Sequence, residues 1–231
     1  MNLSIGSLTA VPALTRPDLL AAPVADALAA LDEATSSAVG VAEIDPAAAD
    51  TAAFCERYGV SPEESANCVV ITGRRDGATR YAACVILATT RADVNNVARR
   101  ELDVRKASFA AMDTAVEQTG MEYGGITPVG LPAPWPVLVD ALVADTRSMV
   151  IGSGVRRSKL VLPGKLLASL PGAKVIEGLG RRGTAQAATT ARGRLMLWHR
   201  RYFARGWPGS VRGARTRGRA GARSRRTRLC R

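Results

Sequence analysis

The chain has 231 residues, of which 47% are hydrophobic, and this is ample for a buried core. Its formal net charge of +12 is unevenly distributed: residues 181–231 contain 16 Arg and no Lys, Asp or Glu, whereas residues 1–180 contain 16 basic and 20 acidic residues, a net charge of −4. The body is therefore mildly acidic, and the basic signature of a nucleic-acid-binding protein belongs to the tail alone.

Cysteine usage and hydropathy exclude several classes of protein. Cys55, Cys68, Cys84 and Cys230 are too far apart for CxxC metal spacing and too few for a disulfide framework, so we expect reduced thiols and a cytosolic compartment. No apolar run approaches the roughly 18 residues of a membrane span, and residues 1–14 lack the basic region of an export signal. The composition therefore predicts a soluble, cytoplasmic protein with no membrane partner.

The first elements are predicted from periodicity and capping residues. Residues 1–16 show few periodic features and are expected to form a loose lead-in. Apolar residues at helical spacing predict an amphipathic helix over residues 17–34, whose beginning Pro23 is expected to kink. A second helix is expected over residues 47–58, closed by Gly59 in the left-handed conformation.

A β-hairpin is the clearest element of the middle of the chain. Two apolar runs within residues 67–89 flank a charged turn in which Asp76 and Gly77 supply the turn chemistry. A helix over residues 111–120 is expected to close at Gly120. Further strands are expected at residues 36–45, 106–110, 136–140, 147–154, 159–162 and 173–178, and further helices at residues 92–102 and 163–172.

Strands and helices alternate irregularly and include a hairpin, which favours a mixed α/β (α+β) fold over a doubly wound parallel one. We expect a single domain over residues 17–180, with a largely antiparallel sheet flanked by helices. Residues 181–231 are rich in Arg, Gly and Ala, and we expect a disordered basic tail.

Residues 120–136, GMEYGGITPVGLPAPWP, combine four glycines and four prolines between two apolar segments. Glycine allows positive φ and close approach of a ligand to the backbone, whereas proline fixes φ, so the stretch predicts a rigid loop with exposed amides. A mere connection between a helix and a strand is the alternative. About seventeen residues without secondary structure are long for that role, which favours a functional loop.

Several kinds of chemistry are excluded by the residues that are missing. The single histidine, His199, lies in the tail, so the body lacks a Ser-His-Asp triad, a Cys-His pair and a histidine metal cluster. Neither a Walker A pattern nor a GxGxxG after a strand is present, which argues against a nucleotide cofactor. We therefore expect no metal and no cofactor, and a site built from backbone amides, hydroxyls, lysine or water.

Three motifs carry a resemblance to a known family. VNNVARRELDVRKASFA, TGMEYGGITPVGLPAPWPVLVD and IGSGVRRSKLVL resemble, in this order and spacing, the YbaK/prolyl-tRNA editing family over roughly residues 39–178. The resemblance implies a YbaK-like fold and an aminoacyl-tRNA deacylase that acts in trans on the acceptor end of a mischarged tRNA. It also implies an aminoacyl-tRNA synthetase as a further partner.

The resemblance assigns site residues to two segments. The family's GxxxP loop corresponds to residues 124–128, where Gly125 and Thr127 are the catalytic candidates and the backbone is expected to cradle the ester. The second segment, GSGVRRSK, suits the phosphates and ribose of an acceptor end, although a solvated basic turn explains its cations equally well. The candidate substrate-binding residues of the two segments are Gly124, Ile126, Pro128, Gly130, Gly152, Ser153, Gly154, Arg156 and Lys159.

One position departs from the family pattern. Editing members of the family carry a lysine where this chain has Asn67, and asparagine offers hydrogen bonds but neither positive charge nor a basic amine. Lys106 is a candidate to replace that lysine from a neighbouring strand, against the alternative of an ordinary strand-end lysine, and Ser108 is either a pocket contact or an exposed hydroxyl. Asn67 is retained as a catalytic candidate because substrate-assisted cleavage would leave the protein mainly to position the ester.

Three alternatives remain open at the level of function. The first is an active deacylase, and the second is a catalytically weak or silent module that binds an aminoacyl or tRNA end. The third, which the sequence favours least, is an RNA-binding protein that acts through its tail and has a structural body. The tail likewise has two interpretations: an RNA-binding arm, or the product of out-of-frame translation of GC-rich DNA, which its lack of Lys, Asp and Glu favours.

Overall fold

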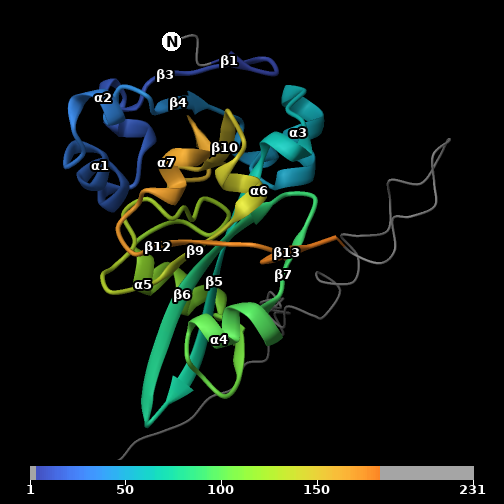
Figure 1. Cartoon of the computed structure of the whole chain (residues 1–231). Helices are drawn as coiled ribbons and strands as arrows, with labels where there is room; N and C mark the ends of the chain where they lie inside the picture. Colours follow the sequence, from blue (N-terminus) through green and yellow to red (C-terminus); the bar gives the residue numbers. More distant parts are fainter. Residues whose placement is uncertain (1–3, 183–231) are drawn as a thin grey trace, which may run out of the picture. The chain divides into compact units, whose positions relative to one another are not determined.

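Two sheets organise the part of the chain that this computed structural model describes, residues 4–182 (Figure 1). The first sheet has the strand order β10 (Met149–Gly152), β11 (Ser158–Leu162), β4 (Gly40–Glu43) and β3 (Val11–Pro12). All of its neighbouring strands are antiparallel. It therefore brings the second motif segment, between β10 and β11, against a strand from the N-terminal part of the chain.

The second sheet has the order β12 (Ala173–Ile176), β9 (Val137–Asp140), β6 (Ala78–Leu87), β5 (Ala66–Arg75) and β8 (Ala107–Phe109). The pairings of β9 with β6 and with β12 are parallel, and the others are antiparallel. Helices flank both sheets in Figure 1. The expected mixed, largely antiparallel α/β fold is thereby confirmed.

The two sheets meet where Ser65, just before β5, forms a parallel bridge with Val150 of β10. The main apolar cluster lies against this junction and includes residues of α1 (Ala22–Ala29), α6 (Ala141–Ala144) and α7 (Gly164–Ala168). This packing fixes the start of β5 beside the first half of β10.

Two smaller clusters cover other sheet faces. The helix α3 (Thr51–Tyr58) packs its fully buried Phe54 in one cluster with Val161 of β11. The π-helical turn η5 (Val94–Ala98), which continues into α4 (Arg99–Glu101), covers one face of the β5–β6 hairpin. A continuous α-helix had been expected over residues 92–102, and the tighter α-helical part is only one turn.

Turn and capping predictions are confirmed. The hairpin turns at Asp76 and Gly77, with φ of 52° and 80°. Gly59 ends α3 with φ 62°, and Gly120 ends α5 (Met112–Thr119) with φ 66°. These positions were predictable because a left-handed backbone conformation is a local requirement that glycine meets without a steric cost.

The helix predicted over residues 17–34 begins only at Ala22. The 3₁₀ turn η2 (Pro17–Leu19) precedes it, and Pro23 occupies the first turn of α1. Within a longer helix the ring of Pro23 would clash with a carbonyl one turn earlier, so proline starts this helix instead of kinking it. A separate short helix, α2 (Glu33–Ser36), follows, and the side chain of its N-cap residue accepts a backbone hydrogen bond.

The N-terminal segment differs from the expected loose lead-in. β1 (Ser4–Ile5) pairs with β2 (Leu8–Thr9), and Ile5 and Leu8 are buried in the cluster that contains α3. Two apolar residues in two-residue strands leave no periodicity in the sequence, so this packing could not be predicted from pattern.

The remaining short elements are η1 (Ala13–Thr15), η3 (Pro46–Ala48), η4 (Pro62–Glu64), β7 (Arg91–Ala92) and β13 (Gly180–Arg181). The prediction of a disordered tail falls almost wholly outside the described residues, which end at 182. Among residues 4–182, no helix combines the length and hydrophobicity of a membrane span, and no group of three or more His, Cys, Asp or Glu residues is arranged to hold a metal ion.

Candidate functional site

The Gly-Pro loop, residues 120–136 between α5 and β9, is hydrogen-bonded to the segment that links β10 and β11. Gly154 donates its backbone N–H to the carbonyl of Gly125 at 2.7 Å, and Glu122 donates to the carbonyl of Gly154 at 2.8 Å. These bonds join residues 120–130 and residues 152–156 into one unit, which we call the two-loop cradle. Two motif segments that are separate in the sequence are therefore adjacent in the structure.

Glycine is required at the contact between the two loops. A Cβ atom on Gly152 would lie 2.3 Å from the carbonyl oxygen of Gly125 and 2.7 Å from that of Ile126. A Cβ atom on Gly125 would lie 2.7 Å from the backbone of Val155. Both approaches are closer than any side chain permits, so these glycines allow the two backbones to meet.

The cradle offers backbone donors that no other group occupies. The N–H of Gly125 donates to the carbonyl of Glu122 at 2.9 Å within a turn. Within the described part of the chain, the N–H groups of Gly124 and Ile126 donate no hydrogen bond. Gly124 is exposed and has φ 83°. The geometry thus points to the amides on either side of Gly125, rather than to Gly125 itself, as donors for a ligand.

Thr127 carries a polar atom without a partner. The residue is 0% exposed, and its Oγ1 is, among residues 4–182, the one buried side-chain nitrogen or oxygen with no hydrogen bond. Its backbone N–H approaches the sulfur of Met121 at 3.5 Å, and the following Pro128 is also buried. A buried hydroxyl without a hydrogen-bond partner destabilises the folded protein unless a ligand supplies that partner.

Three predicted substrate-binding residues face α1. A Cβ atom on Gly130 would lie 2.2 Å from the carbonyl oxygen of Pro23, and one on Gly154 would lie 2.4 Å from the Cβ of Ala21. The carbonyl of Ser153 accepts the N–H of Ala21 at 3.2 Å. Their observed contacts hold the cradle to the first turn of α1.

Arg156 connects the cradle to the segment that precedes α3. Its guanidinium donates to the carbonyl of Tyr123 at 3.2 Å and to that of Pro46 at 3.3 Å, and it lies 3.8 Å from the carboxylate of Asp50. The group also lies close to the exposed Gly124, where a Cβ would be 2.4 Å from Nη1. Protein partners therefore already engage much of a side chain that was expected to meet phosphates or solvent.

Lys159 is buried beneath α3. Its side chain is on the sheet face that carries Val161, its Nζ donates to the carbonyl of Ala49 at 3.0 Å, and the Nζ lies 5.4 Å from the centre of the Phe54 ring. Lys159 pairs with Gly152, and paired residues present the same face of a sheet. The carbonyls of the cradle that lie over Gly152 are therefore on the face that receives the ammonium.

Burial lowers the pKa of Lys159 to about 8, because desolvation disfavours the charged form. The neighbouring Asp50 and Cys55 act in the opposite direction, and Arg156 adds to the lowering. A pKa near 8 leaves roughly nine in ten of these side chains protonated at pH 7. At neutral pH the residue is mainly a buried cation.

Asn67 completes the group around the start of α3. Its Oδ1 accepts a hydrogen bond from Oγ1 of Thr51 at 2.7 Å, and the side chain is half-buried. The consecutive residues 49–51 thus contact Lys159, Arg156 and Asn67 in turn. The structure brings together three predicted site residues from three separate segments.

Lys106 and Ser108 are not part of this group. Ser108 pairs with Thr72, five residues along β5 from Asn67, which corresponds to about 17 Å. Both Lys106 and Ser108 are exposed. Lys106 is therefore not placed to replace the family lysine at the position of Asn67.

The sequence pattern does not mark Asp50 and Thr51 as site residues. An acidic residue followed by a hydroxyl at a helix start is a usual capping pattern, but the side chain of Asp50 makes no capping hydrogen bond here. Thr51 binds Asn67, and Asp50 lies near Arg156 and raises the pKa of Lys159. Only the tertiary contacts distinguish these residues from other helix caps.

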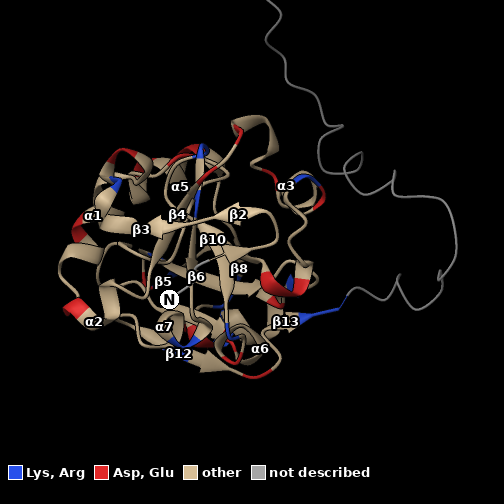
Figure 2. Ribbon diagram, turned by 90° about the horizontal axis from the view of Figure 1, so that it is seen from above, with Lys and Arg blue, Asp and Glu red and all other residues tan. Residues whose placement is uncertain are grey.

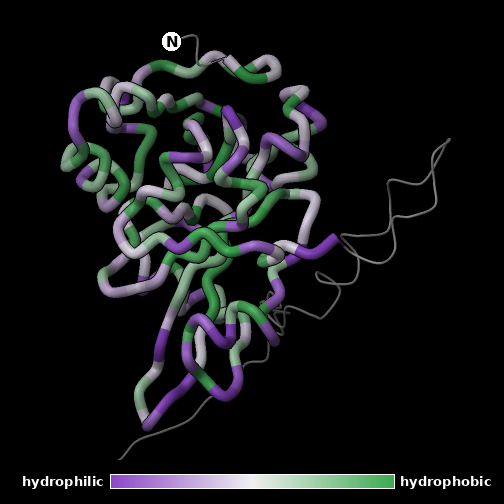
Figure 3. Tube along the Cα trace, viewed as in Figure 1, coloured by the Kyte–Doolittle hydropathy of each residue, from purple (hydrophilic) through white to green (hydrophobic). Residues whose placement is uncertain are grey.

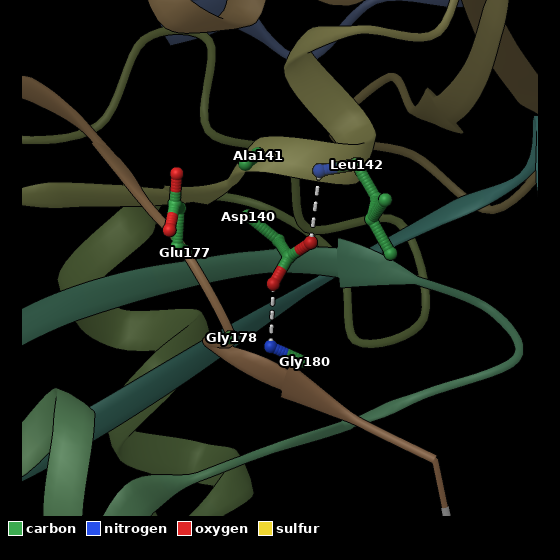
Figure 4. Close-up of a pocket in the computed structure, with 6 residues that line it drawn as sticks. All are labelled: Asp140, Ala141, Leu142, Glu177, Gly178 and Gly180. Atoms are coloured by element: carbon green, nitrogen blue, oxygen red, sulfur yellow. Dashed lines mark hydrogen bonds between the residues drawn. The ribbon is translucent and has the colours of Figure 1, made fainter.

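Two surface hollows are lined by residues outside the cradle. One, with a volume of about 380 Å³, is lined by residues at the end of β9, in α6 and at or just before the start of β13 (Figure 4). There Asp140 accepts the N–H of Leu142 at 3.0 Å and that of Gly180 at 2.6 Å, so its carboxylate is occupied by backbone. The other, of about 370 Å³, lies beside α3 and is lined by Ala47, Ala48, Ala53, Glu56 and Arg57.

Comparison with known families identifies the class of protein that this fold and cradle define. Residues 45–170, more than half of the chain, match the model of the aminoacyl-tRNA editing domain. The chain belongs to this family, and the YbaK/prolyl-tRNA editing resemblance of its motifs is confirmed.

Solved structures share the fold. One, described as a candidate trans-editing enzyme for prolyl tRNA synthetase, has a TM-score of 0.58 and 20% identity, and the match covers 71% of this chain and 99% of the other. A structure from a study of computational epitope grafting on scaffold proteins has the same score and identity and is covered over 97% of its length. The hypothetical protein APE2540 has a TM-score of 0.54 and 23% identity, with 61% and 90% of the two chains covered.

Proposed function

We propose that the protein hydrolyses the ester of a mischarged aminoacyl-tRNA in trans. The observation that carries the proposal is the two-loop cradle, in which the amides beside Gly125 are unoccupied and a buried cation, Lys159, lies on the same side of the sheet. Fixed donors and a desolvated positive charge are what a developing oxyanion needs, because they stabilise it without reorganising. Family membership supports the same class of substrate.

The chemistry divides between the amides and the lysine. A water molecule attacks the ester carbonyl, and the N–H groups of Gly124 and Ile126 are proposed to stabilise the negative charge that forms on its oxygen. The ammonium of Lys159 adds charge stabilisation and donates a proton to the departing ribose oxygen. The proton released by the attacking water restores the ammonium, and the products are a free amino acid and tRNA. Asn67, held by Thr51, is proposed to orient the acceptor end through its amide.

A silent binding module remains the second candidate, because Asn67 carries no charge where editing relatives carry lysine.

To distinguish the two candidates, the full-length protein should be incubated with a panel of misacylated tRNAs. Loss of ester above the uncatalysed rate on at least one tRNA supports the deacylase, and loss without any synthetase present supports action in trans. Binding without hydrolysis across the whole panel would instead establish the silent module. Adding a synthetase tests whether such an enzyme is a partner.

The orphan hydroxyl of Thr127 gives a sharper test of the cradle. We expect Thr127→Val to leave the free energy of unfolding unchanged or to raise it by about 1 kcal/mol, because the hydroxyl has no partner to lose. If the substrate forms a hydrogen bond with that hydroxyl, the deacylation rate of the variant should be roughly tenfold lower. Chemical denaturation and single-turnover deacylation measure the two effects.

Thr119→Val is the matched control, because the buried Thr119 hydroxyl donates to the carbonyl of Ala115 at 2.7 Å. This change should cost about 1 kcal/mol of stability and leave the deacylation rate unchanged. Unchanged deacylation by Thr127→Val would show that the hydroxyl does not take part.

A further inference from the structure

Residues 72–109, which we call the basic lobe, differ in charge from the rest of the body. They comprise the outer part of the β5–β6 hairpin, η5, α4 and β8, and they contain 8 basic and 4 acidic residues, a net charge of +4. The other residues up to 180 contain 8 basic and 16 acidic residues, a net charge of −8. Red acidic segments lie on α1, α2 and α3 in Figure 2, at the opposite end of Figure 1 from the hairpin tip.

The acidic residues of the basic lobe are already neutralised by ion pairs. The pairs are Asp76 with Arg75, Asp93 with Arg181, Glu101 with Lys174, and Asp103 with both Arg75 and Arg80, at distances between 2.6 and 3.5 Å. Each carboxylate of the lobe therefore has a cationic partner, and further positive charges of the lobe remain without one.

The excess cations lie on the surface and are partly fixed. Within the described part of the chain, Arg74, Arg99, Arg100, Arg105 and Lys106 have no carboxylate within ion-pair distance, and all but the half-buried Arg99 are exposed. Arg99 and Arg100 each donate their Nε to the backbone carbonyl four residues earlier, at 2.8 and 2.9 Å. Figure 3 shows the hairpin tip as a hydrophilic segment. These guanidinium groups are held in place for an external anion.

The basic lobe and the candidate site share one face of the hairpin. Asn67 pairs with Ile86, and Ile86 belongs to the apolar cluster through which η5 and α4 cover β5 and β6. Paired residues point to the same face, so α4 lies on the face that presents Asn67. From Asn67 to Arg75, which points to the same face, the strand extends over about 26 Å. A rod-like anion with its end at Asn67 would pass along the lobe.

We propose that the basic lobe binds the phosphate backbone of the double-stranded acceptor arm of the tRNA whose 3′ end enters the cradle. This inference rests on the proposed function. Arginine is suited to phosphate because its planar guanidinium donates bidentately, and shape and backbone contacts dominate the recognition of duplex RNA. The unpaired cations are spread over the end of β5, α4 and the segment before β8, which fits an extended duplex better than a single bound phosphate.

The test compares two pairs of charge removals in the full-length protein. Arg100→Ala with Arg105→Ala removes two cations from the lobe, and Arg147→Ala with Lys165→Ala removes two exposed cations from elsewhere on the body. Binding is measured with uncharged tRNA at several salt concentrations, so that the result does not depend on deacylation. We expect the lobe pair to weaken binding roughly tenfold and to lower the slope of log Kd against log salt by about 2.

The control pair should leave the affinity and the slope near those of the parent protein, and Arg100→Lys with Arg105→Lys should retain most of the affinity because the charge is kept. The lobe pair should bind a short single-stranded 3′ oligonucleotide as the parent does, since this ligand is too short to reach α4. Equal losses from the lobe pair and the control pair would overturn the proposal. A loss that appears only when a synthetase is present would assign the lobe to a protein partner instead. Failure of the deacylase proposal, by contrast, would appear in the parent protein as binding without hydrolysis.

Discussion

Replacing Lys159 with methionine is expected to lower the deacylation rate at least 100-fold while leaving the protein folded and no less stable. Loss of one donor to a developing oxyanion typically costs a factor of 10² to 10³. Burying an ammonium is costly, and methionine fills a similar volume among the apolar neighbours of Lys159 without that cost. Single-turnover deacylation and thermal unfolding measure the two effects.

The stability of the protein should also change with pH in a way that Lys159→Met removes. The pKa of Lys159 is about 8 in the folded protein and 10.5 for an ordinary lysine. Between these pH values the unfolded chain binds more protons than the folded one, so the free energy of unfolding rises with pH in this window. Below pH 8 both states are protonated and the lysine lowers stability by a constant amount. The rise should be absent from the Lys159→Met variant.

Deacylation, corrected for uncatalysed ester loss, should decline as the pH rises through about 8, because the ammonium loses its proton. The double variant with Lys159→Met and Asn67→Lys should recover part of the rate. It returns an ammonium group to the side chains that contact residues 49–51. The exposed Lys165→Met serves as the control and should change neither rate nor stability. If Lys159→Met unfolds the protein or keeps its full activity, Lys159 is a structural residue.

Gly152→Ala is expected to slow deacylation strongly by separating the two loops of the cradle. The added Cβ would lie 2.3 Å from the carbonyl oxygen of Gly125, and because both contacts at this position are backbone atoms no flexible side chain can yield. The loop must move, and we expect a loss of stability of about 1–3 kcal/mol together with a drop in rate of at least 100-fold.

The rate should be measured at a temperature where circular dichroism shows the Gly152→Ala variant to be folded. Gly178→Ala controls for the general cost of adding a methyl group, since Gly178 has positive φ and open space around it. This control should lose stability and keep its rate. Folded Gly152→Ala with the parent rate would mean that the contact between the loops is not needed for activity.

Local elements of the fold could be predicted because their causes are local. Gly59 and Gly120 end helices in the left-handed conformation, and Asp76–Gly77 turns the hairpin, as their residue types indicate. The later start of α1 was missed because one proline can either kink or begin a helix, and the surrounding packing decides between the two. The burial of Ile5 was missed because its partners lie far along the chain.

The candidate site shows the same division. Its loops were recognisable from their glycines and prolines, and so was the absence of lysine at position 67. Lys106 and Lys159 could not be ranked from sequence, since both precede or begin an apolar run that reads as a strand. The register of the strands places Lys106 at an exposed position and Lys159 beneath α3, where the Lys159 Nζ donates to the carbonyl of Ala49.

The sequence by itself determined the family, the mixed α/β class, the position of the Gly-Pro loop and the replacement of the family lysine by Asn67. Each of these depends on residue types within a short window or on their order. Only the tertiary structure decided that Lys159 is a buried cation and that residues 49–51 join it to Arg156 and Asn67. The physical reason is that burial and charge proximity arise from contacts between segments up to about 110 residues apart, as for Lys159 and Ala49, and these contacts follow from strand pairing.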